Sequence, residues 1–130
     1  MKDIKGAEIQ LGDHLIITVS RKSHYLTSAT VEKLQEDGSI VVRYSSTIAT
    51  KTLRPGDLAL IFMPRPYVLD GRLGLCRDCV NQIIEPGQKV LYRDQRMGMS
   101  ISAVSKVVDE LWVELEDGSK VRNVGIYVMS

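Results

Sequence analysis

The sequence predicts an all-β protein that consists of two small β-barrels in tandem. The first reason is internal repetition. Gly12 and Gly87, which lie 75 residues apart, each open the same order of strand, basic loop, strand, acidic turn and further strands. The dipeptide Ser28-Ala29 recurs in the second half as Ser102-Ala103. The other reasons are that short β-branched runs bounded by turn residues are typical of strands, and that no run longer than about ten residues has helical periodicity.

Five strands are expected in the first half, separated by recognisable turns. The first strand is β-branched and follows the Gly12-Asp13 turn. The sequence Glu-Asp-Gly-Ser at residues 36–39 reverses the chain, because Gly accepts a positive φ without steric cost. A further turn at residues 54–57 leads into the last strand. The expected strands are residues 15–19, 28–34, 40–45, 48–53 and 58–62.

The second half repeats this pattern after a connector of different composition. Prolines at 64 and 66 remove ladder donors and end the preceding strand, and residues 67–75 favour a small hairpin. Apolar residues between Cys76 and Ile84 fall at helical spacing, which predicts a short amphipathic helix. The expected strands are residues 89–92, 101–108, 111–115, 120–124 and 126–129. The predicted domains are a first barrel at 8–62, a connector at 63–86 and a second barrel at 87–130.

Length and composition limit the classes of protein. Each repeat holds about 45 to 50 residues, a size at which a lone core is marginal, so we expect the halves to pack on each other or on a second copy. A homodimer therefore stays open. With 44% hydrophobic and 25% charged residues the chain is not expected to be disordered. The net charge of +1 argues against a strongly electrostatic partner such as bulk duplex DNA.

The same sequence predicts a soluble location. No apolar run approaches the roughly 18 residues that span a bilayer, and the N-terminus lacks the apolar core of a secretory signal. Two Cys without a signal indicate reduced thiols, hence the cytoplasm, or the nucleus of a eukaryotic host. The chain begins with Met and is expected to be a complete small protein. No membrane association and no cofactor are expected.

Turn glycines and alternating apolar positions give the chain a family resemblance. The residues concerned are Gly12-Asp13, 28–31, 36–44 and 53–58 in the first half and 87–90, Ala103-Val104 and 111–118 in the second. They resemble the SH3-like barrel superfamily, in particular its Tudor and related small-barrel branches. The resemblance implies five-stranded barrels and, as in many Tudor-type members, recognition of methylated Lys or Arg by an aromatic cage. Alternation, however, places Tyr44 on the same face as Ile40 and Val42, which is the core face, and the second repeat has no aromatic residue in the matching loop.

Trp112 is the only Trp and the first candidate for a binding residue. Period-two alternation places Leu111, Val113 and Leu115 inside, and puts Trp112 on the outer face with two glutamates. An outward indole is a reasonable interface anchor, because Trp is enriched at binding hot spots. The alternative is that Trp112 covers the connector helix or the other barrel. The residues predicted to bind protein are Trp112, Tyr67 and Tyr25.

The first loop of each repeat is basic, which raises nucleic acid as an alternative partner. Arg21 and Lys22 in one loop, and Arg93 and Arg96 in the other, could neutralise phosphates. Nearby tyrosines could stack on bases. Three or four charges would give weak, salt-sensitive attachment, so solvated loops are the favoured reading.

Cys76 and Cys79 form a CxxC, a weak candidate for a metal site. A structural zinc ion needs four ligands, and the remaining soft candidates are His14 and His24 in the other half. Both thiols are therefore expected to be small core residues, with metal binding or redox chemistry as alternatives. No nucleophile motif or Gly-rich phosphate loop is present, so we do not expect an enzyme.

Together these features predict non-catalytic recognition of a macromolecule. Protein is favoured over nucleic acid, because the charge is balanced and the best candidate is an outward Trp. The size suits an adaptor or inhibitor, for example one encoded by a virus or mobile element. The alternatives are a nucleic-acid-binding small barrel and a reader of methylated Lys or Arg.

Overall fold

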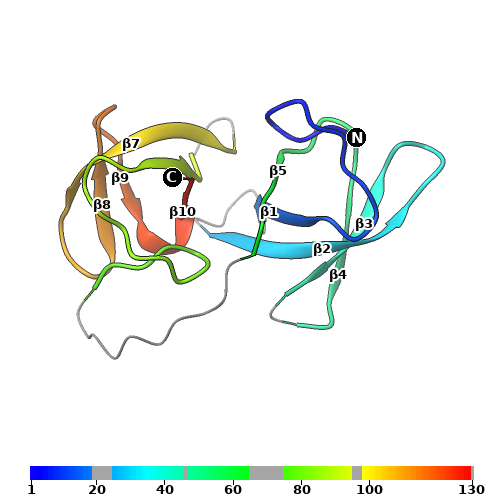
Figure 1. Cartoon of the computed structure of the whole chain (residues 1–130), viewed down its shortest axis with the longest axis horizontal. Coiled ribbons are helices and arrows are strands. Elements are labelled where there is room, and N and C mark those ends of the chain that lie inside the picture. Colours follow the sequence, from blue (N-terminus) through cyan, green and yellow to red (C-terminus); the bar gives the residue numbers. More distant parts are fainter. Residues whose placement is uncertain (19–24, 46, 65–74, 95–97, 130) are drawn as a thin grey trace. The chain divides into compact units, whose positions relative to one another are not determined.

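The computed structural model describes residues 1–18, 25–45, 47–64, 75–94 and 98–129. These residues form ten β-strands and one three-residue 3₁₀ helix, so the all-β prediction is confirmed (Figure 1). The strands make two five-stranded antiparallel sheets. Each of the ten expected strands overlaps an observed one. No helix in the described part of the chain is long and apolar enough to cross a membrane.

The first sheet has the spatial order β4-β3-β2-β1-β5, with β4 and β5 at its edges. Its core is formed by inward apolar residues of the strands, including Leu15, Val31, Val42 and Leu53, each at most 2% exposed. The strands are β1 His14–Thr18, β2 Leu26–Leu34, β3 Ile40–Tyr44, β4 Thr50–Leu53 and β5 Ala59–Ile61.

The second sheet has the order β10-β6-β7-β8-β9, which is the same topology. In both sheets the first strand lies between the last strand and the second one. Figure 1 shows β7 as a long, curved strand. The 3₁₀ helix η1, Asn123–Gly125, precedes the last strand. The strands are β6 Lys89–Tyr92, β7 Ser100–Val107, β8 Trp112–Leu115, β9 Lys120–Arg122 and β10 Ile126–Val128.

Backbone hydrogen bonds fix how the two halves correspond. The carbonyl of Val31 accepts from Gly12 N at 3.0 Å, and that of Val104 accepts from Gly87 N at 2.8 Å. The register shifts directly after both valines, as at a β-bulge. Val31 thus corresponds to Val104, which aligns Ala29 with Ser102. The expected match of Ser28-Ala29 to Ser102-Ala103 is off by one residue, because it rested on composition rather than on pairing.

The prediction of a helix in the connector is wrong. Among residues 75–84 the structure has turns and an isolated bridge between Arg77 and Ile83 in place of a helix. The carboxylate of Asp78 accepts hydrogen bonds from the backbone N–H groups of Val80 at 3.0 Å and Gln82 at 2.8 Å. Asn81 has φ 65°, which no α-helix contains. The apolar spacing that suggested a helix comes from a tight loop that folds its apolar side chains inward.

A matching loop precedes the first sheet. Asp3 accepts from the N–H groups of Lys5 and Ala7, both at 2.9 Å, and Gly6 has φ 85° where the second loop has Asn81. The other carboxylate oxygen of Asp3 accepts from Ile61 N in β5 at 3.1 Å. In the second half, Asp78 likewise binds β10. Each loop therefore ties the last strand of its sheet to the segment before the first strand.

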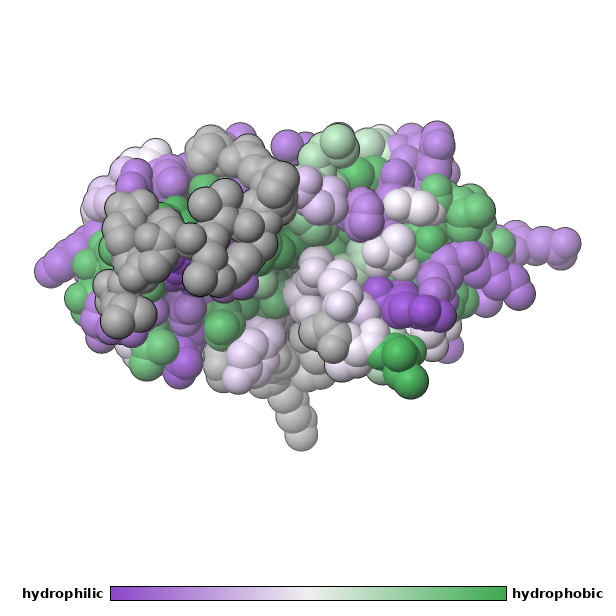
Figure 2. All heavy atoms as spheres, turned by 60° about the horizontal axis from the view of Figure 1, so that its bottom comes forward, coloured by the Kyte–Doolittle hydropathy of each residue, from purple (hydrophilic) through white to green (hydrophobic). Residues whose placement is uncertain are grey.

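The chain divides into two compact units. One comprises Met1–Ile17 and Thr27–Arg65, and the other Thr18–Leu26 and Pro66–Ser130. Each unit has its own hydrophobic core: the first centres on β1, β2 and β3, and the second on β6, β7 and β8. We refer to them as unit 1 and unit 2. In the view of Figure 2, hydrophobic and hydrophilic residues are interspersed over the surface in small patches.

Candidate binding face around Trp112

Trp112 begins β8 and faces away from the core of unit 2. Val113 and Leu115 are buried at 0% and 1% exposure, whereas Trp112 is half-buried and Glu114 is exposed. This is the alternation that the sequence predicts for the strand. Leu111 departs from the prediction, because it lies before the strand and is 47% exposed.

The turn before β8 explains that departure. One carboxylate oxygen of Asp109 accepts from Leu111 N at 2.8 Å and from Trp112 N at 2.9 Å. The two N–H groups therefore point into the turn, and the alternation of the strand starts only at Trp112. Asn123 N donates to the carbonyl of Leu111 at 2.8 Å, which ties this turn to η1. The turn fixes the backbone on which the indole stands.

Two cations from β9 lie over the indole. Arg122 is the direct cross-strand partner of Trp112, and its guanidinium carbon lies 5.5 Å from the ring centroid. The ammonium of Lys120 lies 5.8 Å from the same centroid. Both distances are within the range of cation–π attraction, which is worth about 0.5–1 kcal/mol at exposed sites. The indole is thus held in place by the charged side chains of the neighbouring strand.

A row of charges continues the same face. Glu114 pairs with Lys120 on β9 and with Lys106 on β7, so these three side chains share the outer face with the indole. We call Lys106, Trp112, Glu114, Lys120 and Arg122 the Trp112 face. It contains three cations and one carboxylate, a formal charge of +2 around the single Trp.

Arg122 retains an unused donor. Its Nε is buried and has no hydrogen-bond partner, and the same is true of Oδ1 of Asn123. The amide nitrogen of Asn123 does donate, to the carbonyl of Arg77 at 2.7 Å. A buried donor without a partner is costly. The guanidinium is therefore oriented by its stacking on Trp112 and not by a hydrogen bond from Nε.

The predicted basic loops are only partly described. Arg93 uses its guanidinium inside its own loop, where Nη1 donates to the carbonyls of Asp94 at 2.8 Å and Gly98 at 3.1 Å. It thereby supports the turn between β6 and β7. Tyr25 lies directly before β2 and is 46% exposed. The other predicted residues, Arg21, Lys22, Arg96 and Tyr67, lie outside the described residues.

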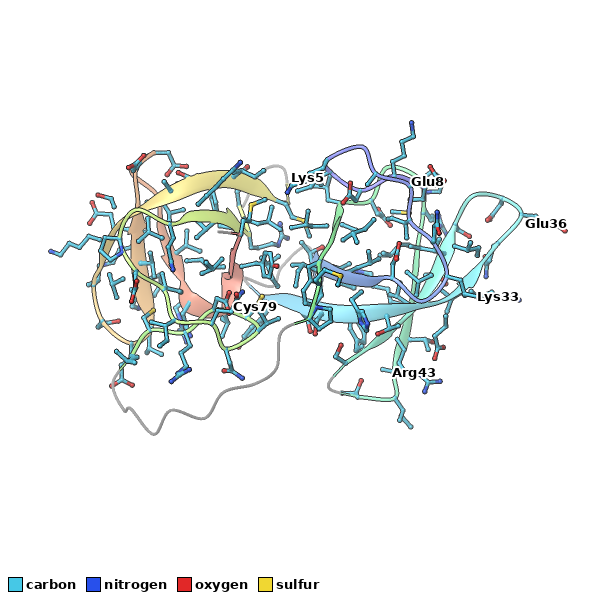
Figure 3. All side chains as sticks on the ribbon, viewed as in Figure 1. Lys5, Glu8, Lys33, Glu36, Arg43 and Cys79 are labelled. Carbon is cyan, nitrogen blue, oxygen red and sulfur yellow. The ribbon has the colours of Figure 1, made fainter. Side chains whose placement is uncertain are left out.

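Of the CxxC thiols, Cys76 belongs to the core of unit 2 and Cys79 is half-buried. Cys76 is 3% exposed and lies in the core cluster. Burial, with the negative charges of Asp109 and Asp78 nearby, raises the pKa of its thiol to about 11. Burial also raises the pKa of Cys79, whose N–H donates to Ile126 of β10 at 2.9 Å (Figure 3). Both thiols are therefore protonated near neutral pH, which disfavours thiolate chemistry.

Metal ligands do not assemble in the part of the chain that the structure describes. No group of three His, Cys, Asp or Glu residues there is arranged to hold a metal ion. Nδ1 of His14 lies 3.2 Å from Oγ1 of Thr30, a hydrogen bond between β1 and β2. His24 lies outside the described residues.

The role of β9 was missed in the sequence, although a signal was present. The four-residue turn Glu-Asp-Gly-Ser at 116–119 joins β8 to β9, so counting outward from it brings Trp112 opposite Arg122. An alternating Lys-Val-Arg strand opposite Trp-Val-Glu places both cations on the indole side.

Searches among protein-family models and among curated proteins find no match for this chain.

Proposed function

We propose that this chain is a non-catalytic binding protein that contacts a protein partner through the Trp112 face. The observation that supports this most directly is the outward indole of Trp112 flanked by Arg122 and Lys120. Trp and Arg are the residue types most enriched at binding hot spots, and neither is needed here to fill the core. The role of an adaptor or inhibitor, acting in the cytoplasm, fits such a face.

We also propose that each sheet curls into an SH3-like barrel. Both units share one strand order, and in each the second strand is the longest, at nine and eight residues. The register shift after Val31 and after Val104 occurs at the same place in both strands. A bulge bends its strand and increases its twist, which is the local change that curling a short sheet requires.

The alternative partners have less support. Stacking of nucleic-acid bases on Trp112 would have to displace Lys120 and Arg122, which already lie over the ring. Arg93 is occupied by carbonyls of its own loop. A methylated Lys or Arg would approach an indole already surrounded by like charge, and Tyr44 packs against the core of unit 1. These observations favour an anionic protein surface over both alternatives.

Affinity capture with the purified chain from its native host, with and without nuclease, tests this proposal. Trp112→Ala should reduce capture of the partner at least tenfold, because hot-spot residues contribute about 2 kcal/mol or more. Arg54→Ala is a control outside the Trp112 face, since Arg54 occupies in unit 1 the position of Arg122 and is exposed. Circular dichroism must show that both variants are folded. Capture that disappears with nuclease, or that Trp112→Ala leaves unchanged, would contradict the proposal.

A further inference from the structure

Strand β9 lies at the edge of the second sheet and has an unused side. Lys120, Val121 and Arg122 pair with β8, and among the described residues their other edge has no strand partner. An exposed strand edge is a template on which an extended segment can add by backbone hydrogen bonds. The Trp112 face is directly beside this edge, since Trp112 is one strand away.

The side chains of β9 would decide which segment fits. Lys120 and Arg122 point to the outer face, whereas Val121 points to the core and is 9% exposed. In a strand added beside β9, the residues opposite Lys120 and Arg122 would share that outer face, and the residue between them would cover Val121. Opposite charges directly across strands attract and like charges repel.

We infer that the edge of β9 binds an extended acidic segment of a protein partner, with Asp or Glu on each side of an apolar residue. The acidic residues pair with Lys120 and Arg122, and the apolar residue covers Val121. A carboxylate opposite Arg122 also comes within reach of the guanidinium at its end that faces the outer surface. This inference rests on the proposed function, because it names the kind of partner that the Trp112 face takes.

Charge also selects against the other occupants of this edge. Antiparallel pairing of β9 with β9 of a second copy would bring Lys120 and Arg122 against cations of the same kind, an arrangement that destabilises a strand pair. A single-stranded nucleic acid would supply anions, but Glu114 lies in the middle of the face and its carboxylate would oppose a continuous phosphate backbone. A peptide, unlike a phosphate backbone, can have an uncharged residue wherever it would come close to Glu114.

A short peptide tests the inference directly. The probe is a capped nine-residue peptide with Glu-Val-Glu at its centre and uncharged flanks, and its counterpart has Lys-Val-Lys. Binding to the intact chain is followed by the fluorescence of Trp112. The Glu peptide should bind at least about tenfold more tightly than the Lys peptide, because two cross-strand charge pairs change sign. In Lys120→Glu/Arg122→Glu this preference should reverse, whereas Arg54→Glu in unit 1 should leave it unchanged.

Backbone pairing has its own signature. Two analogues of the Glu peptide are methylated on alternate backbone nitrogens, so that each loses a different set of donors. Because only every second residue of an added strand donates to β9, one analogue should lose binding and the other should keep it. Equal binding of the two analogues, or of the Glu and Lys peptides, would overturn the inference.

Competing occupants give distinct results. A twelve-nucleotide oligo(dT) that changes Trp112 fluorescence while the Glu peptide does not would assign the edge to nucleic acid. A dimer in sedimentation equilibrium that Lys120→Glu/Arg122→Glu dissociates would assign it to a second copy. Either result overturns the inference. If the peptide fails but Trp112→Ala still abolishes capture of a protein partner, the inference is wrong while the proposed function stands.

Discussion

Removing the carboxylate of Asp78 should destabilise unit 2 strongly. Asp78 is 4% exposed, and its Oδ2 accepts from Val128 N in β10 at 2.8 Å and from Nε2 of Gln82 at 2.9 Å. Its Oδ1 accepts from the N–H groups of Val80 and Gln82. In Asp78→Ala the N–H of Val128 is left buried without a partner, which costs about 1–3 kcal/mol. The other lost bonds add about 0.5–1.5 kcal/mol each.

The sum of these hydrogen-bond losses is an upper bound on the destabilisation, because burying the carboxylate of Asp78 is itself costly. Burial raises the pKa of its carboxyl group, although four hydrogen bonds act in the opposite direction. Asp78→Ala removes this desolvation cost together with the bonds. We therefore expect a net loss of about 3 kcal/mol in the free energy of unfolding, a large share of the about 4–11 kcal/mol expected for a unit of this size.

The single Trp provides the assay. Trp112 lies in unit 2, so its fluorescence during urea unfolding reports on that unit. Asp78→Ala should lower the urea midpoint of this transition. The matched variant Asp3→Ala removes the corresponding carboxylate in unit 1. If the two units unfold separately, this variant should leave the Trp112 transition of unit 2 unchanged. A loss below about 1 kcal/mol in Asp78→Ala would refute the role of this carboxylate.

Three further predictions concern pH, a buried hydroxyl and a turn. The folded-state pKa of Cys76, about 11, is above its unfolded value of 9.0, so its contribution to stability is complete below pH 9 and is lost as pH rises towards 11. When the pH rises from 8 to 10, the free energy of unfolding measured in urea should fall by about 1 kcal/mol less in Cys76→Ala than in the wild type. An equal fall in both proteins would contradict this. Tyr92→Phe removes the 2.6 Å bond from Oη to Asp117 and should cost about 1 kcal/mol in the same assay, with no change in the fold by circular dichroism. Gly38→Ala should lower the thermal midpoint more than Gly118→Ala, because both glycines have positive φ (87° and 90°) but only at Gly38 would the new Cβ meet a neighbour, a proline Cγ at 3.3 Å; the reverse order would show that φ alone decides.

The fold was largely predictable, because it depends on local signals that recur. Alternating apolar residues and glycine turns located all ten strands, and the repeat from Gly12 to Gly87 indicated two units of one kind. The helix near Cys76 was predicted wrongly because a loop of nine residues can bring apolar side chains together without helical backbone. Its true signal was the Asp three residues before Asn81, which repeats Asp3 before Gly6.

The candidate site was predictable only in part. Alternation was sufficient to turn Trp112 outward, because that depends on one strand alone. The cations over the indole come from the next strand, so their contribution depends on register, which the turn between β8 and β9 determines. Arg93 seemed free in the sequence because its partners are backbone carbonyls of its own loop, and no residue type reveals them.

Comparison of the two units separates the features that recur in the fold from those found in unit 2 alone. The features that recur are structural: an Asp in the first loop, a Gly before the first strand and a bulge in the second strand. The Trp112 face does not recur, since backbone pairing aligns Trp112 with Ser39 and Lys120 with Thr52. In unit 1, Arg43 (labelled in Figure 3) instead pairs with Glu32 at 2.7 Å across β2 and β3, which neutralises one cation of its outer face. Unit 1 has the same strand order without an indole and its cation pair, so the topology does not require these side chains in unit 2, which agrees with the binding role proposed for them.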